Sequence, residues 1–492
     1  MSKSLKNLLI IGIFILSMAL VLLVLILTQP KDKTETTETV DTTVMLVSYE
    51  RDNLDCFKVK NKNDEYTIRQ TANSFTVEEL EGLSLNSTVM GAAGNCITTI
   101  KGKQLVEENA PDLKKYGLDE NDFVSKVDVK LKDGTEYSVY FGIDTADGEH
   151  LYVRMADSKD VYTALINSTR YFSYVKEDYV SVSILPELSQ ANRAPTIDFF
   201  TVKRKDLDYD IIFEDDTKNY ATDEVSMASS QVMISPVYAY LDITHSNDVI
   251  YGLWGLNATQ AEVAFPTDEQ MAEYGLADPF CEVILDAELQ KYTLLIGNVA
   301  AYETDANGND TTTPAYYYGY FEGKDVIYLF AAADLPWASF MPIDVLSTMM
   351  TSNYIYALDY IDVEFSGDEP AKYYFDIEAS IDDATLEGTL DSNAFVADDF
   401  KILYQFMLKC PIDSLCLEEP SSDARLLARI DFRRVDGGGD ILEFYDDNTN
   451  RVIVKLNGTT SFSQPQSYLK VLQENIKTFK AGGTGEDIQQ VW

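Results

Sequence analysis

Apolar and polar residues alternate in short runs along most of the chain, a period of two that is typical of half-buried β-strands. Turn residues separate these runs into three groups. The first group comprises residues 44–47, 57–68, 127–131, 136–141, 151–155 and 161–165; the second 197–203, 209–213, 281–285, 292–296, 316–321 and 326–330; the third 358–365, 373–377, 428–434, 441–445 and 452–456. We expect antiparallel hairpins within each group, because Asp-Gly pairs such as Asp133-Gly134 favour tight turns.

Helices are expected between the hairpins, over residues 77–106, 168–176, 224–242, 334–341, 397–409 and 467–479. In the last of these, Leu469, Leu472, Ile476 and Phe479 recur at helical spacing and predict one apolar face that docks on a sheet. The pattern therefore predicts an α+β fold, made of tandem repeats of antiparallel hairpins and sheets packed with short helices.

A Tyr-Gly-Leu triplet occurs twice, each time before an alternating strand pair that ends in glycine. Its members are Tyr116, Gly117 and Leu118 with Gly142, and Tyr274, Gly275 and Leu276 with Gly297. Self-similarity of this kind is the signature of a repeat protein, and a glycine in such a turn indicates a positive φ. We interpret residues 44–180 and 195–345 as two repeat units, and residues 356–480, which lack the triplet, as a divergent third.

The N-terminus contains an unbroken apolar stretch, residues 8–27, without a charge. About 20 such residues suffice for a helix to cross a bilayer, so this segment predicts one N-terminal transmembrane helix. Lys3 and Lys6 precede it, which favours a cytoplasmic tail over residues 1–7 and an extracytoplasmic body. We therefore expect a single-pass cell-membrane protein with a Thr-rich linker over residues 28–43 and a flexible tail over residues 481–492.

The charge of the chain limits its partners. Its formal net charge is −42, while 46% of its residues are hydrophobic, enough to build folded cores. Nucleic acid is excluded as a partner because like charges repel. The acidity indicates either a solvated surface or a patch that recruits cations or a basic partner.

Catalytic motifs are scarce, and the sequence predicts a protein that is not an enzyme. There are two histidines, His150 and His245, in unrelated contexts. Catalytic triads and histidine-rich zinc sites need imidazole groups, so both are disfavoured. Adjacent carboxylates are common in so acidic a chain and do not by themselves make a hydrolase. No cofactor-binding fingerprint is present. Cys410 and Cys416 are close enough in sequence to pair, and whether they do stays open.

Two groups of residues are candidates for binding. The connector residues Asp305, Asn307, Asn309 and Asp310 carry oxygen atoms that could hold Ca²⁺, although Asp, Asn and Gly are also what hairpin turns prefer. Alternation places Tyr316, Tyr318 and Tyr320 on one face of a strand, which could stack sugars or peptides or be a half-buried sheet surface.

The order of hairpin, helix, Tyr-Gly-Leu, glycine-ended hairpin, Tyr152-Val153 strand and terminal helix resembles the bacterial domain-of-unknown-function family 4340. The resemblance implies an auxiliary protein of ABC transporters of the gliding-motility type, with a permease and ATPase complex as partner. It implies no catalytic residue. A surface glycan- or peptide-binding protein acting alone is the alternative, and a hydrolase is a more distant one.

Overall fold

The computed structural model describes residues 43–490, except 73, 190–193, 218–227, 410, 411 and 413. The expected membrane segment, residues 8–27, lies outside the described residues. Within the part that is described, no helix combines the length and the apolar character needed to cross a membrane. Cys416 carries a free thiol, and Cys410 lies outside the described residues.

The described chain is mostly β-sheet, so the α+β prediction is wrong. It forms five sheets, one of eight strands, two of nine and two of two. Residues 77–106 hold a 3₁₀ turn (Glu78–Leu80), the short helix α2 (Ser87–Thr98) and then strands, and the described part of 224–242 forms β15 and β16. Residues 168–176 and 334–341 form 3₁₀ turns. Short apolar runs suit a strand or a helix equally well, and pairing with distant strands decides between them.

The first large sheet has the strand order β4-β3-β2-β9-β10-β11-β12-β6. Its strands are β2 (Leu54–Asn61), β3 (Glu65–Gln70), β4 (Phe75–Val77), β6 (Gln104–Glu107), β9 (Ser125–Leu131), β10 (Glu136–Asp144), β11 (His150–Met155) and β12 (Val161–Leu165). Two small sheets lie in the same part of the sequence, β1 (Val44–Ser48) with β5 (Thr99–Gly102) and β7 (Leu118–Asp119) with β8 (Asp122–Phe123).

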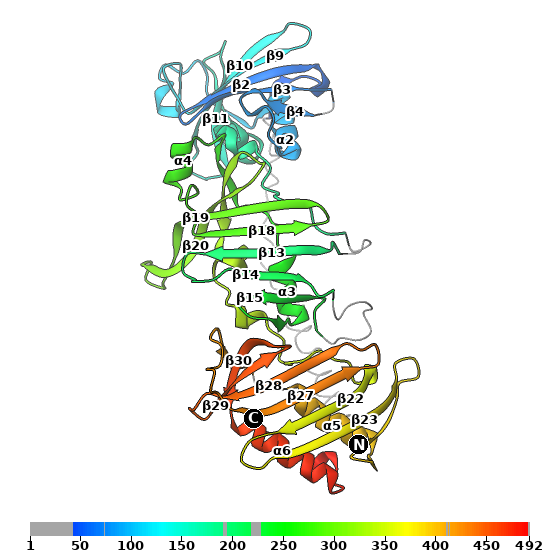
Figure 1. The fold of residues 1–492 in the computed structure, drawn as a ribbon. Coiled ribbons are helices and arrows are strands. Elements are labelled where there is room, and N and C mark those ends of the chain that lie inside the picture. Colours follow the sequence, from blue (N-terminus) through cyan, green and yellow to red (C-terminus); the bar gives the residue numbers. More distant parts are fainter. Residues whose placement is uncertain are drawn as a thin grey trace, which may run out of the picture. The chain divides into compact units, whose positions relative to one another are not determined.

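The second and third large sheets have nine strands each (Figure 1). The second runs β16-β15-β14-β13-β18-β19-β20-β21-β17, with β13 (Ile197–Arg204), β14 (Ile211–Asp215), β15 (Gln231–Ser235), β16 (Ala239–Tyr240), β17 (Gln260–Ala264), β18 (Cys281–Ala287), β19 (Gln290–Thr304), β20 (Asp310–Phe321) and β21 (Val326–Ala331). The third runs β25-β24-β23-β22-β27-β28-β29-β30-β26, with β22 (Leu358–Phe365), β23 (Ala371–Ser380), β24 (Thr385–Leu390), β25 (Asn393–Ala394), β26 (Ser414–Leu415), β27 (Leu426–Arg434), β28 (Gly439–Asp446), β29 (Arg451–Leu456) and β30 (Thr459–Pro465).

The three large sheets repeat one topology. In each, two meanders meet through their first strands, as β2 with β9, β13 with β18 and β22 with β27. The connection between the meanders carries a helix and then the strand that closes the far edge, β6, β17 or β26. These connecting helices are α2, then α3 (Ile243–Ile250) and α4 (Asp268–Glu273), and finally α5 (Ala397–Leu408).

The chain divides into two compact units, Met1–Glu65 with Gly91–Ser173 and Tyr66–Met90 with Tyr174–Trp492. Both nine-stranded sheets belong to the second unit. The expected alternation holds in its strands, since Cys281, Val283 and Leu285 of β18 are fully buried while the residues between them are half-exposed. Burial of such alternating side chains is the main favourable term in the stability of each sheet.

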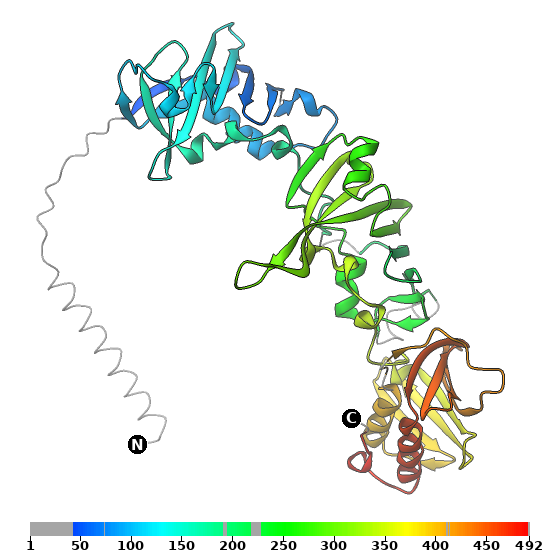
Figure 2. The ribbon, with the colours of Figure 1, turned by 90° about the vertical axis from the view of Figure 1, so that its left-hand side faces the viewer.

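The C-terminal helix α6 (Ser467–Lys480) docks on the third sheet as expected, beside α5 (Figure 2). The residues after it are not the flexible tail that we expected. The backbone amide of Gly485 donates to Asp399 at 2.7 Å, and the side chain of Asn475 exchanges two hydrogen bonds with the backbone of Gln489, at 2.9 and 2.8 Å. Ile488 is buried there, so the segment after α6 is held against α5 and α6 by these hydrogen bonds and this side chain.

A buried polar cluster joins the two nine-stranded sheets. The carboxylate of Asp440, on β28, accepts hydrogen bonds from the Tyr240 hydroxyl of the second sheet at 2.6 Å, from Asn353 at 2.9 Å, from Asn457 at 2.8 Å and from Thr351. Burial, and then the nearby Asp440 charge, raise the pKa of Tyr240 well above its usual value, so this phenol stays protonated and donates. The cluster therefore fixes the second and third sheets to each other.

Candidate functional site

The two Tyr-Gly-Leu triplets form the same backbone corner. Gly117 has a φ of 67° and Gly275 a φ of 74°, which confirms the left-handed conformation expected of both. Leu118 and Leu276, which follow them, are buried. A side chain at either glycine would be strained in this conformation.

Each corner packs against a glycine in the second strand of the hairpin that follows it, Gly142 of β10 and Gly297 of β19. A Cβ atom at Gly142 would lie well under 3.0 Å from the carbonyl oxygen of Tyr116, and so would one at Gly297 from that of Tyr274. No real Cβ atom is found so near a backbone oxygen. The spacing of the motif is thus explained by a close backbone approach, which is a structural role and not a binding one.

The predicted tyrosine face lies on β20 and is partly covered. Tyr316, Tyr318 and Tyr320 share one half-buried side of the strand, while Tyr317 on the opposite side is buried. The ring of Tyr274 packs edge-on against Tyr318 with 4.5 Å between centroids. The Tyr320 hydroxyl is also occupied, donating to Asp325 at 3.2 Å. The arrangement leaves no open stacking platform at Tyr318.

The acidic connector at residues 305–310 is organised as a turn. The Asp305 carboxylate accepts the backbone amides of Asn307 at 2.8 Å and Asn309 at 2.9 Å, and these bonds hold its pKa below the usual value. Asp446, in the matching connector of the third sheet, accepts the amide of Asn448 at 2.9 Å in the same manner. Asp310 opens β20, and in the described residues no group of three or more His, Cys, Asp or Glu side chains could hold a metal ion.

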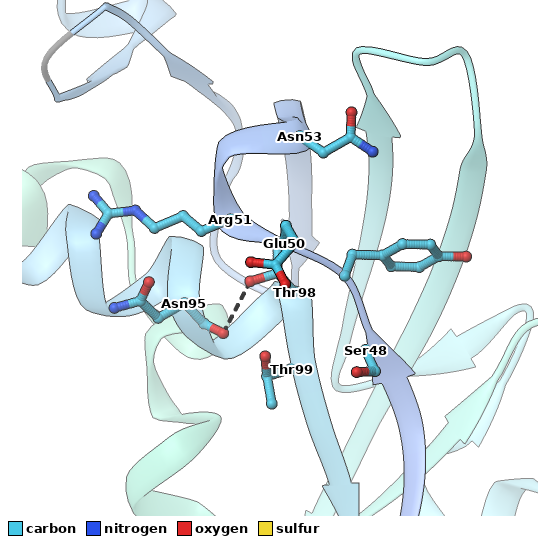
Figure 3. A pocket seen from close by; sticks show the side chains of 8 residues that line it. Ser48, Glu50, Arg51, Asn53, Asn95, Thr98 and Thr99 are labelled. Atoms are coloured by element: carbon cyan, nitrogen blue, oxygen red, sulfur yellow. Dashed lines mark hydrogen bonds between the residues drawn. The ribbon is translucent and has the colours of Figure 1, made fainter.

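A polar cleft that sequence reasoning missed lies in the first compact unit. It has a volume of about 810 Å³ and opens where the end of β1 and the 3₁₀ turn Arg51–Asn53 meet the last turn of α2 and the start of β5 (Figure 3). Its lining residues are Ser48, Tyr49, Glu50, Arg51, Asn53, Asn95, Thr98 and Thr99.

Backbone pairing fixes the walls of this cleft. Ser48 of β1 is paired with Thr99 of β5, and the amide of Tyr49 donates to the carbonyl oxygen of Thr98 at 2.9 Å. The Tyr49 ring stacks on Tyr137 at 5.3 Å, with the ring planes 19° apart. Tyr137 is anchored in turn by a 2.8 Å bond from its hydroxyl to a backbone oxygen of α2.

Several side chains in the cleft are available for a ligand. Ser48, Glu50, Asn95 and Thr99 make no side-chain hydrogen bond to any residue that the structure describes. The lining offers hydroxyl and amide groups, the carboxylate of Glu50 and the guanidinium of Arg51. It holds neither histidine nor cysteine. Such a set can bind a polar ligand by hydrogen bonds.

Little in the sequence signals this site. Residues 48–53 and 95–99 are far apart in the chain and belong to no motif. Only the pairing of β1 with β5 brings them together, and neither strand has a pattern that specifies its partner.

The family model described as a domain of unknown function (DUF4340) matches residues 95–227. This match supports the resemblance seen in the sequence. It includes the first Tyr-Gly-Leu triplet, Gly142 and the α2–β5 wall of the cleft, whereas the second triplet lies outside it. No curated protein and no solved structure matches the chain.

Proposed function

We propose that this protein is a non-enzymatic accessory protein on the extracytoplasmic side of the cell membrane. The apolar segment 8–27 would hold it there, with residues 1–7 in the cytoplasm. Its role would be to bind a partner for an ABC-type transport system, in contact with the permease and ATPase complex. The three large sheets are, on this proposal, three copies of one family module.

The cleft at the end of β1 is the observation that carries this proposal. Its side chains offer hydrogen bonds to a polar ligand, so they suit recognition. The shared strand order of the three sheets supports the idea of three related modules, even though the third lacks the Tyr-Gly-Leu triplet.

Attachment to a membrane would strengthen each contact of such a protein. A tether raises the effective concentration of a partner in the same membrane to the order of millimolar, so weak contacts suffice. We therefore expect a version that begins at Val44 to fold but to fail in a deletion strain, whereas the full chain restores the phenotype. Circular dichroism of the released protein is the folding control. Full complementation by the released protein would contradict the accessory role.

A glycan- or peptide-binding protein that acts alone is the second candidate. The free polar groups beside the exposed Tyr49 ring favour it, because sugars are bound by hydrogen bonds together with an aromatic face. On this candidate the released protein would keep its activity, which separates it from the accessory role.

Ligand binding in the cleft can be tested with one pair of substitutions. If a soluble oligosaccharide or peptide binds there, Glu50→Gln with Asn95→Ala should weaken it at least tenfold, because each lost hydrogen bond is worth about 1 kcal/mol. Calorimetric titration against a panel of oligosaccharides and peptides measures this. Glu120→Gln with Asn121→Ala, an exposed pair in the β7–β8 turn, is the matched control. Equal affinities of both variants would place the ligand elsewhere.

A further inference from the structure

The hairpin of β19 and β20 is much longer than its counterparts in the other sheets. These strands have 15 and 12 residues, against 9 and 6 for β10 and β11 and 8 and 6 for β28 and β29, which hold the same places in the strand order. Figure 2 shows the tip of this hairpin standing away from the rest of its sheet. We call residues 299–315 the arm.

Within the described residues, the two strands of the arm pair only with each other. The pairing of β18 with β19 ends at Cys281 and Ile296, and the pairing of β20 with β21 ends at Tyr316 and Ala331. Beyond these points the arm is a lone two-stranded ribbon. Such a ribbon is marginally stable in water by itself. The arm therefore adds little to the stability of the sheet, and a role in binding would account for its length.

The end of the arm is exposed. Every residue from 301 to 310 is solvent-exposed, and the aromatic side chain of Tyr302 is 45% exposed. Tyrosine is among the residues that most often dominate the energy of protein interfaces, since its ring buries a large area at a small cost in side-chain entropy. Tyr302 is therefore the natural anchor of a contact.

The edges of the arm do not favour addition of another strand. Pro314 lies in β20, opposite Tyr302, and cannot donate a backbone hydrogen bond. The register of β19 against β20 also shifts three times between Val299 and Thr304. Proline and bulges are the devices by which proteins block edge-to-edge pairing. A partner must therefore recognise the side chains of the arm and not its backbone.

The charge of the arm indicates the kind of partner. It carries Glu303, Asp305 and Asp310 and no Lys, Arg or His. Asp305 is occupied by the turn, whereas Glu303 and Asp310 make no side-chain contact with the described residues. A second copy of a chain with a net charge of −42 would be repelled. A basic protein surface fits these charges.

We propose that the arm is a docking element that seats Tyr302 in a groove of a partner protein lined by Lys and Arg side chains, with Glu303 and Asp310 facing those cations. The longer hairpin gives Tyr302 reach beyond the second sheet. This inference does not depend on the cleft of the first compact unit.

The test uses the full chain in cells of the source organism, with the photoreactive residue benzoylphenylalanine in place of Tyr302. We expect a crosslink to one protein, through a peptide that contains Lys or Arg, identified by mass spectrometry. Charge reversal by Glu303→Lys with Asp310→Lys should reduce the yield at least tenfold. Asp382→Lys with Asp383→Lys, in the exposed β23–β24 turn, changes the net charge equally and should leave the yield unchanged.

The milder pair Glu303→Gln with Asp310→Asn should also lower the crosslink yield, by several-fold. Because this pair only neutralises the two charges, it shows whether the loss comes from the charges and not from misfolding. The absence of a crosslinked protein, a crosslink to a second copy of this chain, or a yield that survives charge reversal would overturn the proposal.

Discussion

Replacing Asp440 with alanine is expected to lower the free energy of unfolding of the second compact unit by about 3–5 kcal/mol. The carboxylate is 1% exposed and accepts four hydrogen bonds, one of them from Tyr240 of the neighbouring sheet. Alanine would leave those donors buried without an acceptor, and each unsatisfied buried group costs about 1–3 kcal/mol. Urea denaturation followed by tyrosine and tryptophan fluorescence measures the change.

Two further variants test the origin of that effect. Tyr240→Phe removes the hydroxyl that donates to Asp440 and should cost about 1–2 kcal/mol, with a coupling of about 0.5–3 kcal/mol to Asp440→Asn in a double-mutant cycle. Asp382→Ala, at an exposed turn, should stay within about 0.5 kcal/mol of the unchanged protein. An Asp440→Ala variant as stable as this control would show that the cluster does not join the sheets.

Substitution of Gly297 with alanine should destabilise the second sheet by about 1–3 kcal/mol, because overpacking forces the backbone to move. The new methyl group would meet the carbonyl oxygen of Tyr274 and, at 3.1 Å, the side chain of Leu276. The backbones of the corner and of β19 are both held by hydrogen bonds, so neither can move aside for the methyl group without breaking some of them. Thermal unfolding measures the loss, and Gly142→Ala should act likewise in the first compact unit through Tyr116.

Two further variants accompany this prediction. Gly275→Val places a side chain at a positive φ and beside Asn298, which should also cost about 1–3 kcal/mol. At Gly367 a Cβ would meet only one atom, at 3.9 Å, so Gly367→Ala should change little. A Gly297→Ala variant with the stability of Gly367→Ala would disprove the close approach.

Some features of the fold followed from local pattern alone. Alternation predicted the central strands of each sheet, for example 358–365 as β22, because the side-chain period of a strand is a property of its own residues. It did not predict the outer strands β4, β15, β16, β24, β25 and β30. The helix at residues 397–409 and the terminal helix at 467–479 were predicted for the same reason. The left-handed glycines of the triplets were predictable because few residues other than glycine adopt that conformation.

Other features escaped the sequence because they depend on distant partners. Residues 231–235 read as part of a helix but form β15, since β14 and β16 lie on either side to pair with them. The tail after Lys480 is rich in glycine and looked flexible, yet the side chains of α5 and α6 hold it in place. The intrinsic preference of a short segment for helix or strand is weaker than the effect of such tertiary contacts.

By itself, the sequence determined the central strands of each sheet, the repeated corners, the acidity and the small number of histidines, because each of these is set by residues within a short stretch or by composition. Only the tertiary structure decided the strand order, the burial of Asp440 against Tyr240 and the assembly of the cleft from residues 48–53 and 95–99. These depend on which strands pair across long loops, and a period of two specifies the face that a side chain occupies but not the strand that will lie beside it.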